Sequence, residues 1–154
     1  MELWITPTIA QLEGIMSETE RTLAATADTS VTLPDRAVPI IANLIAKIRT
    51  MITTWSPNTV SAVVTKIPPG FMDDFLIVAR HRVMASIQGF DKSEERDAEY
   101  KAAEAFFDKV ARGIIRPQPA TDAVANDVPS EKVSRVEIVS GPGSRTGRAR
   151  MDGI

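Results

Sequence analysis

The chain has 154 residues, of which 18 are lysine or arginine and 20 are aspartate or glutamate, so its formal net charge is −2. This balance gives none of the overall positive charge typical of proteins that bind nucleic acid or anionic membranes. Without cysteine, the chain can form no disulfide, no thiolate metal site and no cysteine nucleophile. A chain of this length can bury one core of its own.

The first eight residues, MELWITPT, lack the basic start and the apolar run of a secretory signal. The uncharged stretch 51–65 contains Pro57 and several serines and threonines, and it is shorter than the roughly 20 apolar residues that cross a bilayer. We therefore expect a soluble protein that is made in the cytoplasm and has no membrane partner.

Two short helices are predicted before residue 26. The hydroxyl of Thr6 can cap the first helix, and Pro7 suits a first turn because it has no amide hydrogen to satisfy. Ser17 and Glu20 have the spacing of a capping box and predict the start of the second. A polar loop then runs to Pro34.

A long helix is predicted from Asp35 to Ser56. Apolar residues recur there every three or four positions and form one continuous stripe: Val38, Ile41, Ile45, Ile48, Ile52 and Trp55. Pro57 ends the helix because the residue before a proline is disfavoured in helical conformation. The following segment 59–67, TVSAVVTKI, fits either a short strand or an extended link.

The segment 67–115 predicts two helices joined by a short acidic turn. The first follows Pro68, Pro69 and Gly70, and its predicted apolar face comprises Phe71 or Met72, Phe75 or Leu76, Ala79, Val83 and Ile87. The second is predicted to be capped by Asp91 with Glu94, and its apolar face comprises Tyr100, Ala103, Phe107, Val110 and Ile114. The result is an all-α body at 1–116, a small bundle of four to five helices.

Residues 117–154 are predicted to form a long extended arm. They contain four prolines, four glycines and no aromatic residue, and only 133–139, VSRVEIV, has the character of a short strand. Such a segment cannot build a core of its own. We expect it to be disordered or to be ordered by lying on another surface.

Candidate catalytic groups are few. His81 is the only histidine, and we interpret it as a surface or interface residue, although Asp74 or Glu104 could supply a carboxylate to it. Asp73 and Asp74 are adjacent in the first turn of a helix, where its dipole favours negative charge. We therefore predict no enzyme and no cofactor.

Arginines and tryptophans are more informative about partners. The arginines between residues 80 and 116 are balanced by acids, which favours solvated salt bridges or salt bridges between subunits over a basic ring. Trp4 and Trp55 are interpreted as core or interface anchors. Arg145, Arg148 and Arg150 give the end of the arm a basic excess, so a small DNA-binding or packaging-regulating module is the alternative function.

Several features together resemble the head-to-tail connector proteins, also called adaptor or head completion proteins, of tailed bacteriophages. They are a short acidic N-terminal helix, a long amphipathic helix, the link Ile67-Pro68-Pro69-Gly70, the helix FMDDFLIVARHRVM and a closing helix ending KVARGII. The chain looks nearest to the Mu-like prophage group, whose closing helix ends in a Lys-x-Val-Ala-x-Gly motif, matched at 109–113. The end of the chain, RARMDGI, also looks similar. The resemblance covers about 6–115 and the last ten residues.

The resemblance implies a structural virion protein without catalysis, located at the neck between head and tail. It implies a ring of identical subunits, of dodecameric size, that docks on the portal protein, contacts tail or neck proteins and surrounds the DNA channel. The implied channel-facing candidates are Arg80, Arg82, Arg112 and Arg116. The implied contacts with the portal or a neighbouring subunit are Val133, Val136, Ile138, Arg145, Arg148, Arg150, Met151 and Ile154.

Overall fold

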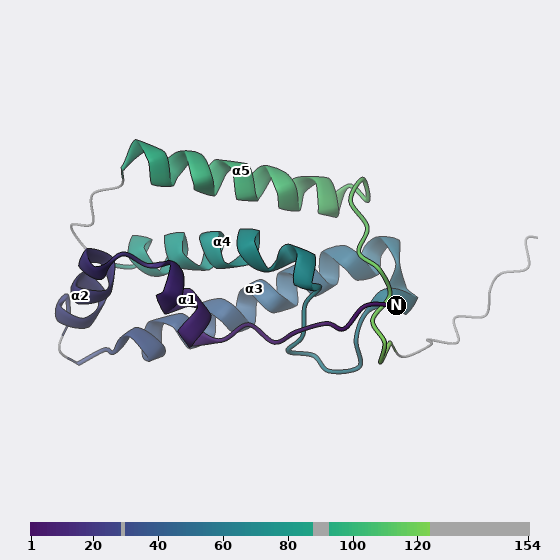
Figure 1. The fold of residues 1–154 in the computed structure, drawn as a ribbon, viewed down its shortest axis with the longest axis horizontal. Coiled ribbons are helices and arrows are strands. Elements are labelled where there is room, and N and C mark those ends of the chain that lie inside the picture. The colour runs from purple at the N-terminus through teal and green to yellow at the C-terminus, as the bar shows by residue number, and fades with distance from the viewer. Residues whose placement is uncertain (29, 88–92, 124–154) are drawn as a thin grey trace, which may run out of the picture.

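The computed structural model describes residues 1–28, 30–87 and 93–123, and these form a helical bundle (Figure 1). Its helices are α1 (Ile9–Ile15), α2 (Glu18–Thr26), α3 (Leu33–Trp55), α4 (Met72–Ala85) and α5 (Glu94–Ala111), with the 3₁₀ turns η1 (Pro57–Thr59) and η2 (Pro69–Phe71). In the described ranges there are isolated β-bridges but no strand. The predicted all-α fold of four to five helices is therefore confirmed, with five helices in the described ranges.

Three of the helices form the body, because α4 packs against both α3 and α5. In Figure 1, α4 lies between α5 and α3, while α1 and α2 cover the end of the bundle near the beginning of α5. The hydrophobic core runs between these helices, and its largest fully buried side chains include Trp4, Phe75 and Ile48. Near the start of α4, the Phe71 ring meets the Phe106 ring edge to face, with centroids 5.2 Å apart.

Side-chain caps explain where the first three helices begin. Ser17 and Glu20 form the predicted capping box, with the Glu20 carboxylate accepting from the Ser17 amide at 2.7 Å. The first cap was predicted wrongly: Thr8, not Thr6, forms a capping box with Gln11, so α1 begins at Ile9. The cap of α3 is Thr32, which places its start two residues before the predicted one.

The helix α3 buries a stripe that differs from the predicted one at both ends. Its buried residues are Leu33, Ala37, Ile41, Leu44, Ile45, Ile48 and Ile52. Val38 and Trp55 were predicted on this stripe but are 55% and 46% exposed. Of the described helices, only α3 is long and apolar enough to cross a membrane by length and composition.

In α5, the predicted buried face is correct for Ala103, Phe107 and Val110. It is wrong for Ile114, which lies beyond the end of the helix and is 69% exposed. The helix is capped by Ser93, whose hydroxyl accepts from the Arg96 amide at 3.3 Å. The predicted cap Asp91 lies outside the described residues.

The link between α3 and α4 is not a strand. After η1, Ser61 and Ile67 form single antiparallel bridges with Ala123 and Ile5, respectively. The segment between them is a series of turns and bends. Ile67 is completely buried, so the link contributes to the core at its end although it has no regular structure.

Gly113 joins the end of α5 to the end of α3. Its φ is +71°, and a Cβ atom at this position would lie 2.8 Å from Cδ2 of Trp55. The Trp55 indole nitrogen donates to the carbonyl of Ala111 at 2.5 Å. Backbone conformation and close packing therefore both require glycine here.

Replacing Gly113 with alanine should lower the free energy of unfolding by about 2 kcal/mol, because the left-handed conformation costs a non-glycine residue about 1–2 kcal/mol and the Trp55 ring must also move. Urea unfolding followed by circular dichroism measures this. The control is Gly14→Ala in α1, where a Cβ atom meets nothing within 4 Å. An equal loss in both variants would contradict the role of Gly113.

Candidate functional site

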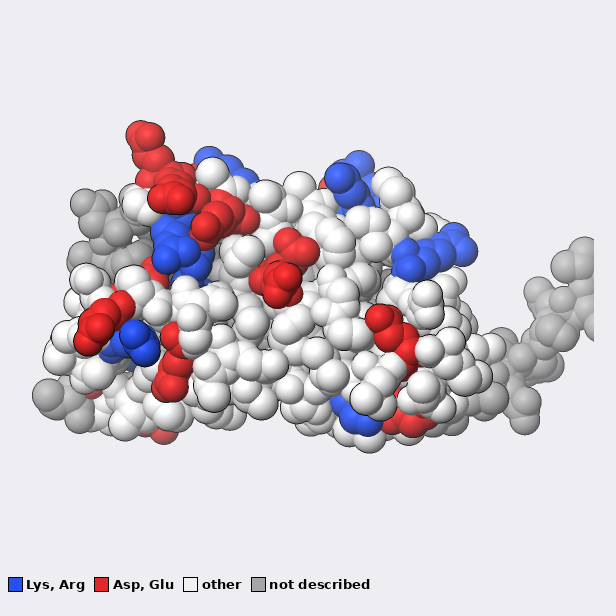
Figure 2. All heavy atoms as spheres, in the orientation of Figure 1, with Lys and Arg blue, Asp and Glu red and all other residues white. Residues whose placement is uncertain are grey.

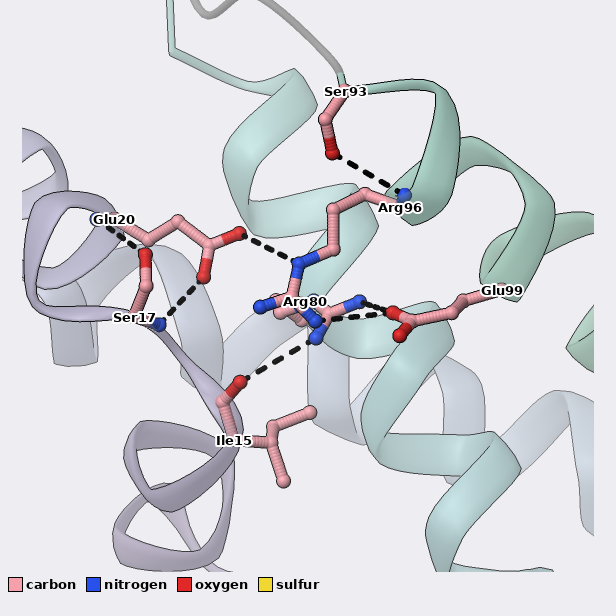
Figure 3. Close-up of polar contacts among 7 residues, drawn as sticks. All are labelled: Ile15, Ser17, Glu20, Arg80, Ser93, Arg96 and Glu99. Carbon is pink, nitrogen blue, oxygen red and sulfur yellow. Dashed lines mark hydrogen bonds and ion pairs between the residues drawn. The ribbon is translucent and has the colours of Figure 1, made fainter.

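Arg80 was predicted to face a channel, and the structure corrects this. The residue is only 4% exposed, because it lies on the side of α4 that packs inside the subunit. Its guanidinium donates to the Glu99 carboxylate at 2.6 Å and to the Ile15 carbonyl at 3.4 Å (Figure 3). Arg80 therefore holds α1, α4 and α5 together.

A chain of polar contacts continues from this arginine to α2. Arg96 donates to the same Glu99 carboxylate at 3.0 Å, and its Nε lies 3.9 Å from the carboxylate of Glu20, which is 6% exposed. Figure 3 shows the two arginine side chains beside one another, with the carboxylate of Glu99 from α5 facing both. The hydrogen bond from Arg80, followed by that from Arg96, lowers the pKa of Glu99. These contacts are salt bridges within one subunit, whereas the sequence favoured solvated salt bridges or salt bridges between subunits.

The other predicted channel arginines lie nearer the surface. Arg82 is half-buried, whereas Arg112 and Arg116 are exposed after the end of α5. Arg112 pairs with Asp108 one turn earlier, and the Nε of Arg116 donates to the Gly113 carbonyl at 3.1 Å. On the face in Figure 2, basic and acidic side chains are interspersed, so no patch of a single sign dominates it.

His81 is half-buried and stacks on Tyr100, with ring centroids 3.6 Å apart and an interplanar angle of 11°. The Tyr100 hydroxyl is hydrogen-bonded to Glu104, one of the two carboxylates considered for His81. Burial, followed by this carboxylate, raises the pKa of Tyr100. Asp74 is partly buried in the first turn of α4, where burial and then the charge of Asp73 raise its pKa.

A groove of about 420 Å³ is lined by residues of α3, α4 and α5. Its apolar lining includes Leu44, Met51 and Phe107, and its charged lining residues are Lys47, Arg82, Glu104 and Asp108. Two positive and two negative side chains make the groove neutral overall. It suits a mixed peptide surface better than a strongly charged ligand.

The described beginning of the arm lies on the body. The Trp4 indole donates to the Gln118 carbonyl at 3.2 Å, and the Glu2 amide donates to the Pro119 carbonyl at 2.8 Å. Ala120 is completely buried and donates to the Thr59 carbonyl at 2.9 Å. Residues 118–123 are thus held between the N-terminal segment and the link.

Asp122 fixes the side of the arm that faces the link. Its carboxylate accepts from the Ser61 hydroxyl at 2.8 Å and lies 3.3 Å from the Lys66 ammonium. The hydrogen bond from Ser61 is the main cause that lowers the pKa of Asp122. The beginning of the arm is therefore fixed by the polar contacts of Asp122 with Ser61 and Lys66, at the end of the bundle where α3 ends.

Arg49, on α3, also organises the link. Its guanidinium donates to the carbonyls of Ser61, Val63 and Lys66 at 2.7, 3.0 and 3.0 Å. A segment of turns has no ladder of backbone hydrogen bonds to pair its carbonyls, although the Val63 carbonyl also accepts from the Lys66 amide at 3.2 Å. The guanidinium of one arginine donates to three of these carbonyls.

Replacing Arg49 with alanine should lower the free energy of unfolding by about 1–3 kcal/mol, because three carbonyls lose a charged donor. It should also speed hydrogen exchange in residues 61–67. The matched control is Lys47→Ala on the exposed side of the same helix, with an expected effect below about 0.5 kcal/mol. Unchanged exchange of the link in the Arg49 variant would show that the link holds its shape without this side chain.

Sequence reasoning missed Arg49 and Asp122, since nothing in their local sequence marks their distant partners. The predicted partner-binding residues Val133, Val136, Ile138, Arg145, Arg148, Arg150, Met151 and Ile154 all lie outside the described residues, as does the predicted strand 133–139. Within the described part of the chain, no cluster of three or more metal-ligating side chains occurs.

No protein-family model, curated protein or solved structure matches the chain.

Proposed function

We propose that the chain is a structural subunit of a bacteriophage head-to-tail connector. In this proposal, identical subunits form a ring at the neck of the virion, dock on the portal and join it to tail or neck proteins around the DNA channel. A dodecamer is the proposed ring size. The helical body sets the shape of the subunit, and the arm reaches a portal subunit or a neighbouring copy.

The observation that carries the proposal is where the arm leaves the body. The N-terminal segment, the link and residues 118–123 meet at one end of the bundle, opposite the end covered by α2 (Figure 1). Three sets of contacts anchor the root of the arm there: Trp4 with Gln118, Thr59 with Ala120, and Ser61 with Asp122. Because residues 118–123 are held firmly on the body, the rest of the arm could attach its subunit to another protein.

The motifs behind the resemblance also support the proposal, because they fall at helix ends. The pair Pro68-Pro69 leads into η2, which begins α4. The motif at 109–113 closes α5, and its Gly113 is the residue that packs against Trp55. Sequence features shared with connectors therefore lie at positions that determine the shape of this bundle.

Arg82, Arg112 and Arg116 remain the proposed channel-facing residues, and Arg80 is withdrawn. Arg112 and Arg116 are exposed, and each contacts an acceptor three or four residues earlier in the chain, so both could exchange that contact for a phosphate. Such contacts would be independent of DNA sequence.

The test is the mass of the purified protein alone and after mixing with portal rings from the same genome. We expect the full chain to join the portal ring as a multimer, and a chain ending at Ala123 to join it at least tenfold more weakly. A full-length protein that stays monomeric and never joins the ring would overturn the proposal. Tight DNA binding by that monomer, weakened steeply by salt, would favour the DNA-binding alternative.

A further inference from the structure

A second groove, of about 470 Å³, runs along the outer side of α3. It is lined by small or apolar residues, with one charged exception: Ala42, Ile45, Ala46, Arg49, Thr50, Thr53, Val60, Val64 and Thr65. The guanidinium of Arg49 donates to carbonyls of the link. The surface offered to a ligand is therefore largely uncharged, which favours an apolar peptide over an ion.

The groove is one part of a broad apolar surface. Ala42 and Ala46 are exposed one helical turn apart, Val38 is exposed one turn before them, and Val64 at the rim is 70% exposed. Only a third of the most apolar window of α3 is buried. Alanines on a helix allow an extended backbone to approach closely, and a covering segment would remove these side chains from water.

The described chain ends beside this groove. Ala123 forms an antiparallel bridge with Ser61, and the Ala62 amide donates to the Asp122 carbonyl at 3.1 Å. Val60, Val64 and Thr65, from the same link, line the groove. Residues 124–154 therefore continue from a point next to it.

We infer that, in the free subunit, residues 133–139 of the same chain cover this groove, with Val136 and Ile138 packed on Ala42 and Ala46. In an extended segment, residues two positions apart lie on one face, so Val136 and Ile138 can enter the groove together. The nine residues 124–132 can span up to about 30 Å. The part of α3 from Ala42 to Thr53 is only about 17 Å long.

The same chain is favoured over a second copy because the short connection gives a local concentration in the millimolar range. The inference concerns the isolated subunit and holds whether or not the subunit later joins a ring. It is therefore independent of the connector proposal, and its test uses no portal.

The test is disulfide formation between cysteines introduced at Ala46 and Val136 in the full chain, which has no cysteine of its own. Under mild oxidation at low micromolar protein, we expect most molecules to form an intrachain disulfide, seen as a faster monomer on a non-reducing gel. The matched control pairs Val136→Cys with Ala102→Cys, on the exposed side of α5. Its yield should be at least tenfold lower.

Equal yields from the two pairs would overturn the inference, because they would mean that the arm reaches both surfaces without preference. Crosslinked dimers as the main product at low concentration would overturn it too, since the occupant would then be a second copy. The substitutions are at exposed positions of the helices, and circular dichroism of each reduced variant verifies that the body is folded.

Discussion

Replacing Trp4 with alanine should lower the free energy of unfolding by about 3–5 kcal/mol, the usual cost of removing a fully buried tryptophan. Trp4 is 1% exposed, and its indole donates to the Gln118 carbonyl at 3.2 Å. The substitution leaves a cavity between the N-terminal segment and the arm and leaves that carbonyl without its donor. Residues 118–123 should therefore loosen, with faster exchange of their amide hydrogens. Urea unfolding and hydrogen exchange measure the two effects.

Two variants separate packing from general effects at the N-terminus. Trp4→Phe keeps an aromatic ring and loses the hydrogen bond, so it should lose only about 1–2 kcal/mol. Leu3→Ala changes the neighbouring side chain, which is 67% exposed, and should cost less than about 0.5 kcal/mol. A Trp4→Ala protein with unchanged hydrogen exchange in residues 118–123 would show that the arm is held by its other contacts.

Replacing Arg80 with alanine should lower the free energy of unfolding by about 2–4 kcal/mol. Its side chain is 5% exposed, so the change removes buried methylene groups as well as the bonds to Glu99 and the Ile15 carbonyl. Glu99 keeps Arg96 as a partner and is 37% exposed, which limits the loss. The control is Arg112→Ala, whose pair with Asp108 is exposed on both sides and should be worth less than about 0.5 kcal/mol.

The Arg80 variant should also change how stability depends on pH. The pKa of Glu99 in the folded protein lies below its ordinary value of 4.5, so its ion pairs stabilise the fold above that pH. This stabilisation is lost as the pH falls through the lowered pKa. The difference in unfolding free energy between the parent protein and Arg80→Ala should therefore narrow between pH 5 and pH 3. A constant difference over that range would mean that Arg80 stabilises the fold only through packing and its bond to the Ile15 carbonyl.

Local sequence was sufficient to predict where some of the helices begin or end. The capping box of Ser17 and Glu20 depends on residues three positions apart, and the pattern in the sequence is the contact in the structure. The end of α3 before Pro57 follows in the same way from the geometry of one proline. The first helix offered two candidate caps, Thr6 and Thr8. The prediction chose Thr6 because Pro7 follows it, and it missed Gln11, which completes a capping box with Thr8.

Contacts between distant residues were not predictable from these patterns. Arg80 looks like any helix arginine, and only the arrival of Ile15 and Glu99 from two other helices makes it a buried residue. Val38 keeps the period of the apolar stripe, but Ala37 and Leu33 face the core at that end of α3. The stripe was therefore correct in its centre and wrong at both ends: at the start the buried face is displaced by one residue, and at the end Trp55 is 46% exposed.

The contact between Trp4 and Gln118 also bears on the order in which the protein folds. The two residues are 114 positions apart, so they close nearly the whole body into one loop. During synthesis, Trp4 leaves the ribosome long before Gln118, and the N-terminal segment has to wait for its last partner. Local pairs such as α4 with α5 can form earlier, because their chain separation is short. We therefore expect completion of the core and attachment of the arm to come together, late in folding.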